Sequence, residues 1–187
     1  MKLRMLGQVT MAALLLGWGA AGAATKESAP PPLSDAGIAR RLAHEVNMYP
    51  YYTIWDAVSF QVANGQVVIQ GAVNQPFKKS DIESIVRHVP GVTGVTDDVK
   101  VMPLSPFDDR IRIAVARAIY SDPALSRYAM LPVPGIHILV DGGHVTLTGV
   151  VNNELEKSVA GMRASGAGMS FGPVTNNLVV ERPAKRS

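Results

Sequence analysis

NGQVVIQGAVN (residues 64–74) and GGHVTLTGVVN (residues 142–152) decide the fold, because they are two versions of one motif. Aligned without gaps, residues 65–80 and 143–158 share seven of sixteen positions. The shared residues are, in the first copy, Gly65, Val67, Gly71, Val73, Asn74, Lys79 and Ser80. Self-similarity of this kind indicates a duplicated structural unit.

The similarity extends to both sides of this motif. Downstream, VTDDVKV (residues 95–101) matches VTNNLVV (residues 174–180). Upstream, each copy has apolar residues at intervals of four, which are Ile38, Leu42 and Val46 in the first copy and Ile111, Val115 and Ile119 in the second. The sequence therefore predicts two copies of a unit of about 70–80 residues, divided near residues 103–105.

Each copy is predicted to begin with a helix, because apolar side chains four residues apart lie on one helix face. Pro50 and Pro123 follow the two helices and end them. In the second copy Ser105, Pro106 and Asp108 provide a cap, a first-turn proline and an acid at the capping-box position.

Three strands and a second helix complete the unit. The predicted strands are residues 57–62, 66–73 and 95–101 in the first copy and 135–140, 144–151 and 174–181 in the second. The second helix starts near Pro76 or Glu154. The recurring glycines are assigned to turn and close-packing positions, not to phosphate binding: Gly65, Gly71, Gly143 and Gly149. The order α-β-β-α-β predicts an α+β fold, with two helices packed on a small three-stranded mixed sheet.

The N-terminus is predicted to direct export. Residues 1–24 combine Lys2 and Arg4 with a short apolar run and small residues, which is typical of a cleaved signal peptide. Residues 25–33 contain three consecutive prolines and are expected to form a stiff linker. Without Lys2 and Arg4 the 18 basic residues fall to 16, against 15 acidic ones, so the exported chain is nearly neutral. We therefore expect no general attraction to nucleic acid.

Composition excludes several kinds of site. The chain has no cysteine, which removes disulfides, thiolate nucleophiles and cysteine-based metal clusters. Aromatic residues make up only 6% of the chain, too few to favour a surface on which bases stack. We expect no cofactor.

The element order and the motifs NGQVVIQGAV, DGGHVTLTGVV, VPGVTGVTDDVKV and GPVTNNLVV together resemble the BON family, named for bacterial osmotically induced and nodulation proteins. The resemblance covers residues 34–181, as one BON domain at 34–104 and a second at 105–181, followed by a basic tail at 182–187. It implies a non-enzymatic envelope module that contacts phospholipid or other envelope components and supports membrane integrity under osmotic stress. It also implies a periplasmic location, and the missing cysteine predicts a soluble protein and not a lipoprotein.

The second copy departs from the family pattern at residues 161–172, which read GMRASGAGMSFG. Four glycines weaken a helix by about 1 kcal/mol each relative to alanine. We therefore expect a loop there in place of an ordinary helix end.

A second apolar stripe distinguishes the first helix of the second copy. Ile113, Ala116 and Tyr120 lie opposite its core face, with Arg110 and Arg117 on one flank and Arg112 on the other. The equivalent first-copy residues are Arg40, Ala43 and Asn47. Arginines beside apolar side chains suit an anionic phospholipid surface. The same stripe also suits packing against the first copy, against another subunit or against an envelope protein.

Two other functions remain open. A stress-related protein–protein interaction module, or a chaperone-like one, is consistent with the neutral charge and the glycine-rich segment. A hydrolase would use His137 and His144 with Asp141 between them, but no catalytic motif spacing accompanies these residues. Surface or strand-edge imidazoles are the simpler interpretation, and we expect no enzymatic activity.

Overall fold

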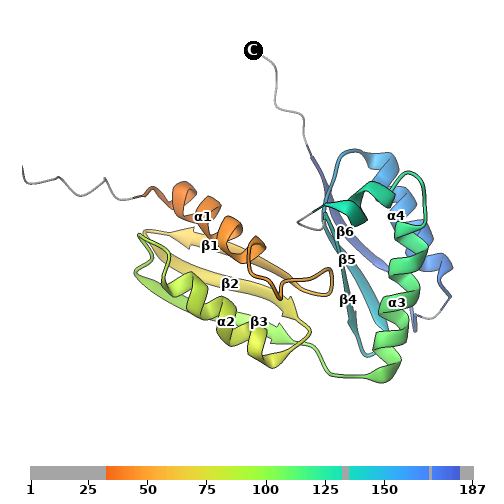
Figure 1. The fold of residues 1–187 in the computed structure, drawn as a ribbon, viewed down its shortest axis with the longest axis horizontal. Coiled ribbons are helices and arrows are strands. Elements are labelled where there is room, and N and C mark those ends of the chain that lie inside the picture. The colour runs from red at the N-terminus through yellow and green to blue at the C-terminus, as the bar shows by residue number, and fades with distance from the viewer. Residues whose placement is uncertain (1–32, 132–134, 169, 182–187) are drawn as a thin grey trace, which may run out of the picture. The chain divides into compact units, whose positions relative to one another are not determined.

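The computed structural model describes residues 33–131, 135–168 and 170–181. The predicted signal peptide, all but the last residue of the linker and the basic tail lie outside these residues. The elements of the first repeat are α1 (Asp35–Asn47), β1 (Ala57–Ala63), β2 (Gln66–Val73), α2 (Pro76–Arg87) and β3 (Gly94–Val101). Those of the second are α3 (Pro106–Tyr120), the 3-10 turn η1 (Ser126–Met130), β4 (Ile136–Asp141), β5 (His144–Val151), α4 (Glu154–Gly166) and β6 (Thr175–Val180) (Figure 1). The α-β-β-α-β prediction is confirmed in both repeats.

Each repeat has one mixed sheet in which the motif strand is central. In the first repeat β2 pairs antiparallel with β1 and parallel with β3. In the second repeat β5 pairs in the same two ways with β4 and β6. The central strand thus contacts both neighbours, which explains why its sequence is the most similar part of the two copies.

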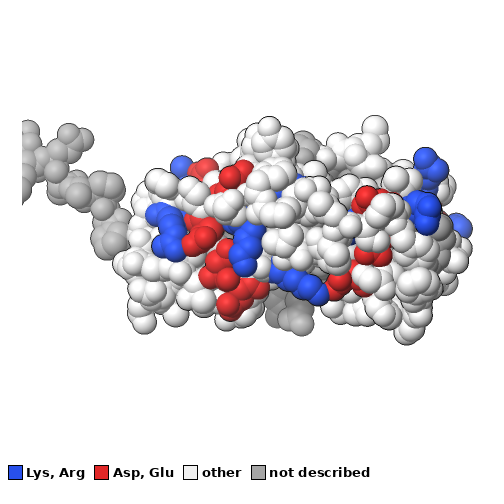
Figure 2. Space-filling model, turned by 90° about the horizontal axis from the view of Figure 1, so that it is seen from below, with Lys and Arg blue, Asp and Glu red and all other residues white. Residues whose placement is uncertain are grey.

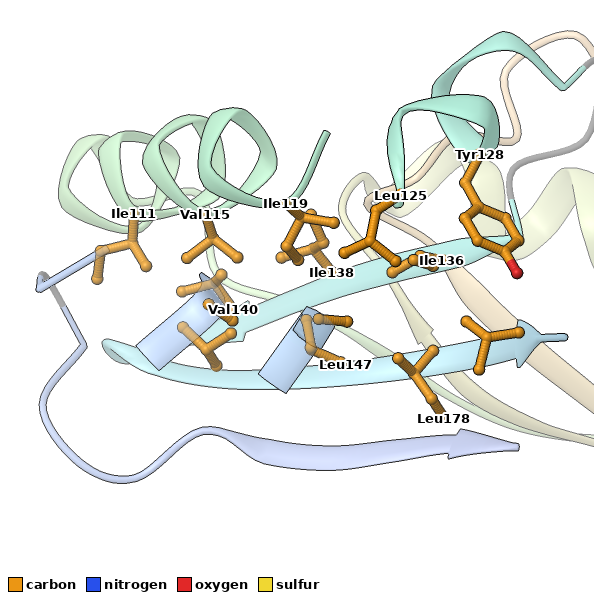
Figure 3. Packing of buried hydrophobic residues seen from close by; sticks show 14 residues of the cluster. Ile111, Val115, Ile119, Leu125, Tyr128, Ile136, Ile138, Val140, Leu147 and Leu178 are labelled. Carbon is orange, nitrogen blue, oxygen red and sulfur yellow. The ribbon is translucent and has the colours of Figure 1, made fainter. Parts of the chain in front are cut away.

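Both helices of a repeat pack on the same face of their sheet. The first core joins Ile38, Leu42 and Val46 of α1 to Ile82 and Val86 of α2 over the buried strand residues. These strand residues are Val67, Ile69, Val73 and Val99. Figure 3 shows the equivalent core of the second repeat, where Ile111, Val115 and Ile119 of α3 point toward β4 and β5. Burial of these apolar side chains drives the folding of each repeat.

The structure corrects the prediction for residues 161–172. Helix α4 continues through Gly161 and ends at Gly166. A Cβ atom at Gly161 would lie 2.8 Å from the Asn176 side-chain nitrogen, which itself donates a hydrogen bond to the Lys157 carbonyl. This glycine therefore allows α4 to approach β6 closely, and the packing outweighs its low helix propensity.

Glycines of the repeated motif have two structural roles. Gly65 and Gly143 lie in the hairpin turns with φ angles of +76° and +85°, a region that favours glycine. Gly71 and Gly149 lie within the central strands with φ angles of +124° and +118°. A Cβ atom on Gly71 would lie 2.1 Å from the Ala57 carbonyl oxygen, so no side chain fits there without moving the backbone.

An aspartate from the first helix holds each hairpin turn. Asp35 accepts hydrogen bonds from the backbone N–H groups of Asn64 and Gly65, at 2.8 and 3.0 Å. Asp108 accepts the equivalent bonds from Gly142 and Gly143, at 3.1 and 2.8 Å. From the sequence, Asp108 is assigned only to the start of the helix. Its contact with the hairpin turn could not be predicted, because Gly142 and Gly143 lie more than thirty residues away.

A buried ion pair lies at the end of the first sheet that is opposite the hairpin turn. Asp56 is 0% exposed and Lys78, on α2, is 4% exposed, and their charged atoms are 2.7 Å apart. Asp56 also accepts hydrogen bonds from the Thr53 backbone, the Thr53 hydroxyl and the Asn74 backbone N–H. The carboxylate thus ties α2 to the residue that follows β2.

The second repeat makes the same connection with its charges exchanged. Glu156 occupies the position of Lys78 and accepts a hydrogen bond from the Asn152 backbone N–H at 3.1 Å, as Asp56 does from Asn74. Its further partners are the Tyr128 hydroxyl, at 2.5 Å, and the Arg127 guanidinium. Burial opposes ionisation of Glu156, but these hydrogen bonds outweigh it and hold its pKa below the ordinary value.

Candidate functional site

The exposed surface of α3 is set by the residues that its opposite face buries. Ile111, Val115 and Ile119 are fully buried against the second sheet. Ser105 caps the helix by accepting a hydrogen bond from the Asp108 backbone N–H at 3.2 Å. The helix is thereby fixed in rotation, and the remaining side chains face solvent or the edges of the sheet.

Three residues form one exposed line along α3, and we call them the α3 stripe: Arg110, Ile113 and Arg117. Spacings of three and four residues place neighbouring side chains on the same side of a helix. Ile113 is 47% exposed. Among the described residues, neither arginine of the stripe forms an ion pair with a carboxylate. The stripe thus presents an apolar side chain between two available positive charges.

Arg112 does not flank this surface, which differs from the sequence expectation. It is 4% exposed and donates hydrogen bonds to the Val140 carbonyl, at 2.8 Å, and to the Asp109 carboxylate, at 2.5 Å. Arg112 directly follows the buried Ile111, so its side chain runs along the edge of the core to β4. The guanidinium group of Arg112 is therefore already bound within the second repeat and is not available to a ligand.

Tyr120 also differs from the expectation of a second exposed stripe. Its hydroxyl donates a hydrogen bond to the Ile136 carbonyl at 2.7 Å, and its ring packs against the second core with Ala116. Burial raises the pKa of Tyr120 to about 12, so the hydroxyl stays protonated and can keep donating at neutral pH. Ala116 and Tyr120 thus pack against the core of their own repeat. Without them, the candidate surface consists of the α3 stripe alone.

Two aromatic residues that the sequence interpretation missed extend the stripe at its N-terminal end. The rings of Phe107 and Phe171 stack with centroids 4.9 Å apart and planes 16° apart. The Arg110 guanidinium lies 5.6 Å from the centroid of the Phe107 ring. Phe171 is 64 residues after Phe107 in the chain, so no local pattern predicts that they meet. The only sequence signal is a lone aromatic in a glycine-rich segment.

The first repeat has no equivalent of this surface. Its helix α1 places Arg40, Ala43 and Asn47 where α3 has Ile113, Ala116 and Tyr120, and all three α1 residues are exposed. Figure 2, which views the molecule from below and not from the side of α1, shows acidic and basic side chains interspersed on that lower face. The distinguishing feature of the second repeat is therefore the combination of Ile113 with arginines and stacked rings.

The histidines of the second hairpin are not brought together. His144 pairs across the turn with Asp141 and is exposed, whereas His137 lies further along β4 opposite Thr148 and is buried. Among residues 33–131, 135–168 and 170–181, no group of three histidine, aspartate or glutamate side chains is placed to hold a metal ion.

None of the helices in the described part of the chain combines the length and apolar character that crossing a bilayer requires.

Comparison with solved structures found similar chains, and two of them come from Chlamydia trachomatis. One is the C-terminal domain of CdsD, described as the structural protein of the type III secretion system, with 16% identity and a TM-score of 0.30. That match covers 80% of this chain and 67% of the other. A second CdsD structure matches with 16% identity and a TM-score of 0.29, over 76% of this chain and 60% of the other. No protein with a curated description matches the sequence.

The family comparison agrees with the internal repeat. The model of the BON domain matches twice, at residues 34–103 and 108–182. The two matches cover most of the chain and coincide with the two α-β-β-α-β units of the structure. The chain therefore belongs to the BON family and contains two BON domains in tandem.

Proposed function

We propose that this tandem BON protein is a non-enzymatic periplasmic adaptor that binds anionic phospholipid surfaces and supports envelope integrity under osmotic stress. The observation that carries the proposal is the α3 stripe, in which an exposed isoleucine lies between two arginines without carboxylate partners among the described residues. The signal-like residues 1–24 support an extracytoplasmic location.

The chemistry of the stripe suits a lipid headgroup layer. A guanidinium group can donate paired hydrogen bonds to a phosphate, and its charge is attracted to anionic lipids. The side chain of Ile113 can enter the boundary between headgroups and acyl chains, where apolar area leaves water. One exposed isoleucine and two arginines give only weak, reversible attachment, which suits an adaptor that binds the membrane transiently.

The family supports the same partner. BON domains are associated with phospholipid binding and with roles in the envelope and in osmotic stress. In this chain the proposed contact belongs to the second domain only, because α1 of the first domain has Arg40 in the place of Ile113. In this proposal both domains act without catalysis.

Substitution of Ile113 by aspartate should lower the affinity for vesicles of phosphatidylglycerol mixed with phosphatidylcholine by about tenfold or more. The change removes apolar contact and adds a negative charge between two arginines. Vesicle flotation at low salt measures it, with pure phosphatidylcholine vesicles as the neutral comparison.

Leu155→Asp is the matched control, because Leu155 is also exposed and apolar, lies on α4 of the same repeat and undergoes the same charge change. It should leave vesicle binding nearly unaltered. Failure of the wild-type chain to bind phosphatidylglycerol or cardiolipin vesicles would remove the lipid proposal and favour a protein partner.

A further inference from the structure

Phe171 has an exposed ring and two contacts with its own repeat. It is 68% exposed, yet its backbone N–H donates a hydrogen bond to the Gly143 carbonyl at 3.0 Å and its ring stacks on Phe107. The ring lies against the hairpin turn at Gly143. A Cβ atom on this residue would lie 2.2 Å from the ring, so the contact requires glycine. The contacts hold one side of the ring and leave the other side to solvent.

The first repeat has the same backbone contact without the rings. Thr93 donates its N–H to the Gly65 carbonyl at 2.8 Å and so occupies the position of Phe171. The residues preceding the two turn-holding aspartates also differ, being Ser34 in the first repeat and Phe107 in the second. The stacked pair is therefore a feature that the second repeat adds to a shared framework.

The pair is continuous with the α3 stripe through Arg110, which lies over the Phe107 ring. Apolar rings thus adjoin a positive charge at the N-terminal end of α3, and Ile113 and Arg117 continue the surface along the helix. Phenylalanine, like tryptophan and leucine, is a typical apolar residue of segments that lie in the boundary between headgroups and acyl chains. The positive charges next to the ring select an anionic surface over a neutral one.

We infer that Phe171 inserts into the interfacial layer of an anionic bilayer while the arginines of the α3 stripe bind headgroup phosphates. The inference rests on the proposed function and adds a residue, a depth and a division of labour. The ring supplies apolar contact that is insensitive to salt, and the arginines supply attraction that salt screens.

The absence of cysteine from the chain allows a direct test, because any single cysteine introduced is unique. Phe171→Cys labelled with the environment-sensitive fluorophore NBD should show a blue shift with phosphatidylglycerol–phosphatidylcholine vesicles and quenching by brominated lipid. Thr93→Cys carrying the same label, at the equivalent position of the first repeat, should show neither. Phe171→Ser should lower vesicle affinity about tenfold in high salt as well as in low salt.

The outcomes separate the inference from the function on which it rests. Vesicle binding without a blue shift at position 171, or with full affinity retained in Phe171→Ser, would overturn the insertion of this ring and leave the proposed function intact. Equal shifts at positions 93 and 171 would overturn its restriction to the second repeat. No binding of the wild-type chain to anionic vesicles would overturn both.

Discussion

Asp56→Ala should destabilise the first repeat by about 3–5 kcal/mol, because it leaves the Lys78 ammonium buried without its counter-charge. The Asn74 N–H and the Thr53 hydroxyl lose their acceptor in the same change. Urea unfolding followed by circular dichroism measures the loss.

The double variant Asp56→Ala with Lys78→Met is the critical comparison for this prediction. It removes both charges, so only the lost hydrogen bonds and packing remain as a cost, and it should be more stable than the single variant. Equal stability of the single and double variants would show that the ion pair does not stabilise the first repeat in the way described.

Gly71→Ala is expected to cost about 3 kcal/mol or more. The φ angle of +124° disfavours any side chain, and the added Cβ would approach the Ala57 carbonyl oxygen to 2.1 Å. Since β1 pairs with β2 at this point, the ladder itself must shift to admit the methyl group.

Gly142→Ala is a comparison that has a positive φ angle but no clash of the added Cβ atom. Gly142 also has a positive φ angle, +58°, but a Cβ atom added to it would have no neighbouring atom within 4 Å, so the substitution should cost only about 1 kcal/mol. Thermal unfolding of both variants measures the difference, and similar losses at the two positions would contradict a steric role for Gly71.

Much of the fold follows from local sequence. The apolar period of α1 and α3, the hairpin turns and the central strands are each encoded within about a dozen adjacent residues. The repeat strengthens each assignment, because two independent sequences must satisfy one pattern. The prediction for the end of α4 was wrong for a non-local reason: Gly161 is kept in the helix by its close approach to Asn176 on another strand.

The candidate site was predictable only in part. Ile113 could be placed on the outside of α3 because helix geometry fixes its direction relative to Ile111. The same geometry could not show that Arg112 reaches the Val140 carbonyl or that Tyr120 reaches Ile136, because both partners belong to β4. A long side chain beside the core face of a helix forms hydrogen bonds with a neighbouring element, and the position of that element depends on the tertiary structure.

The paired charges behind each second helix were likewise hidden. Lys78 and Glu156 occupy equivalent positions with opposite charge, and their partners come from the segment that precedes the first strand of each repeat. An alignment of the two copies shows the difference at this position but not its compensation. Only the tertiary structure shows that a carboxylate binds the strand-end N–H in both repeats.

The proposed membrane contact lies on α3 and not on α1, and one vesicle titration compares the two helices directly. Arg117→Ser and Arg40→Ser each remove one positive charge from an exposed helix position. With phosphatidylglycerol vesicles at low salt, we predict that Arg117→Ser weakens binding about fivefold and that Arg40→Ser leaves it unchanged. Equal losses for both variants, or a loss confined to Arg40→Ser, would contradict the account.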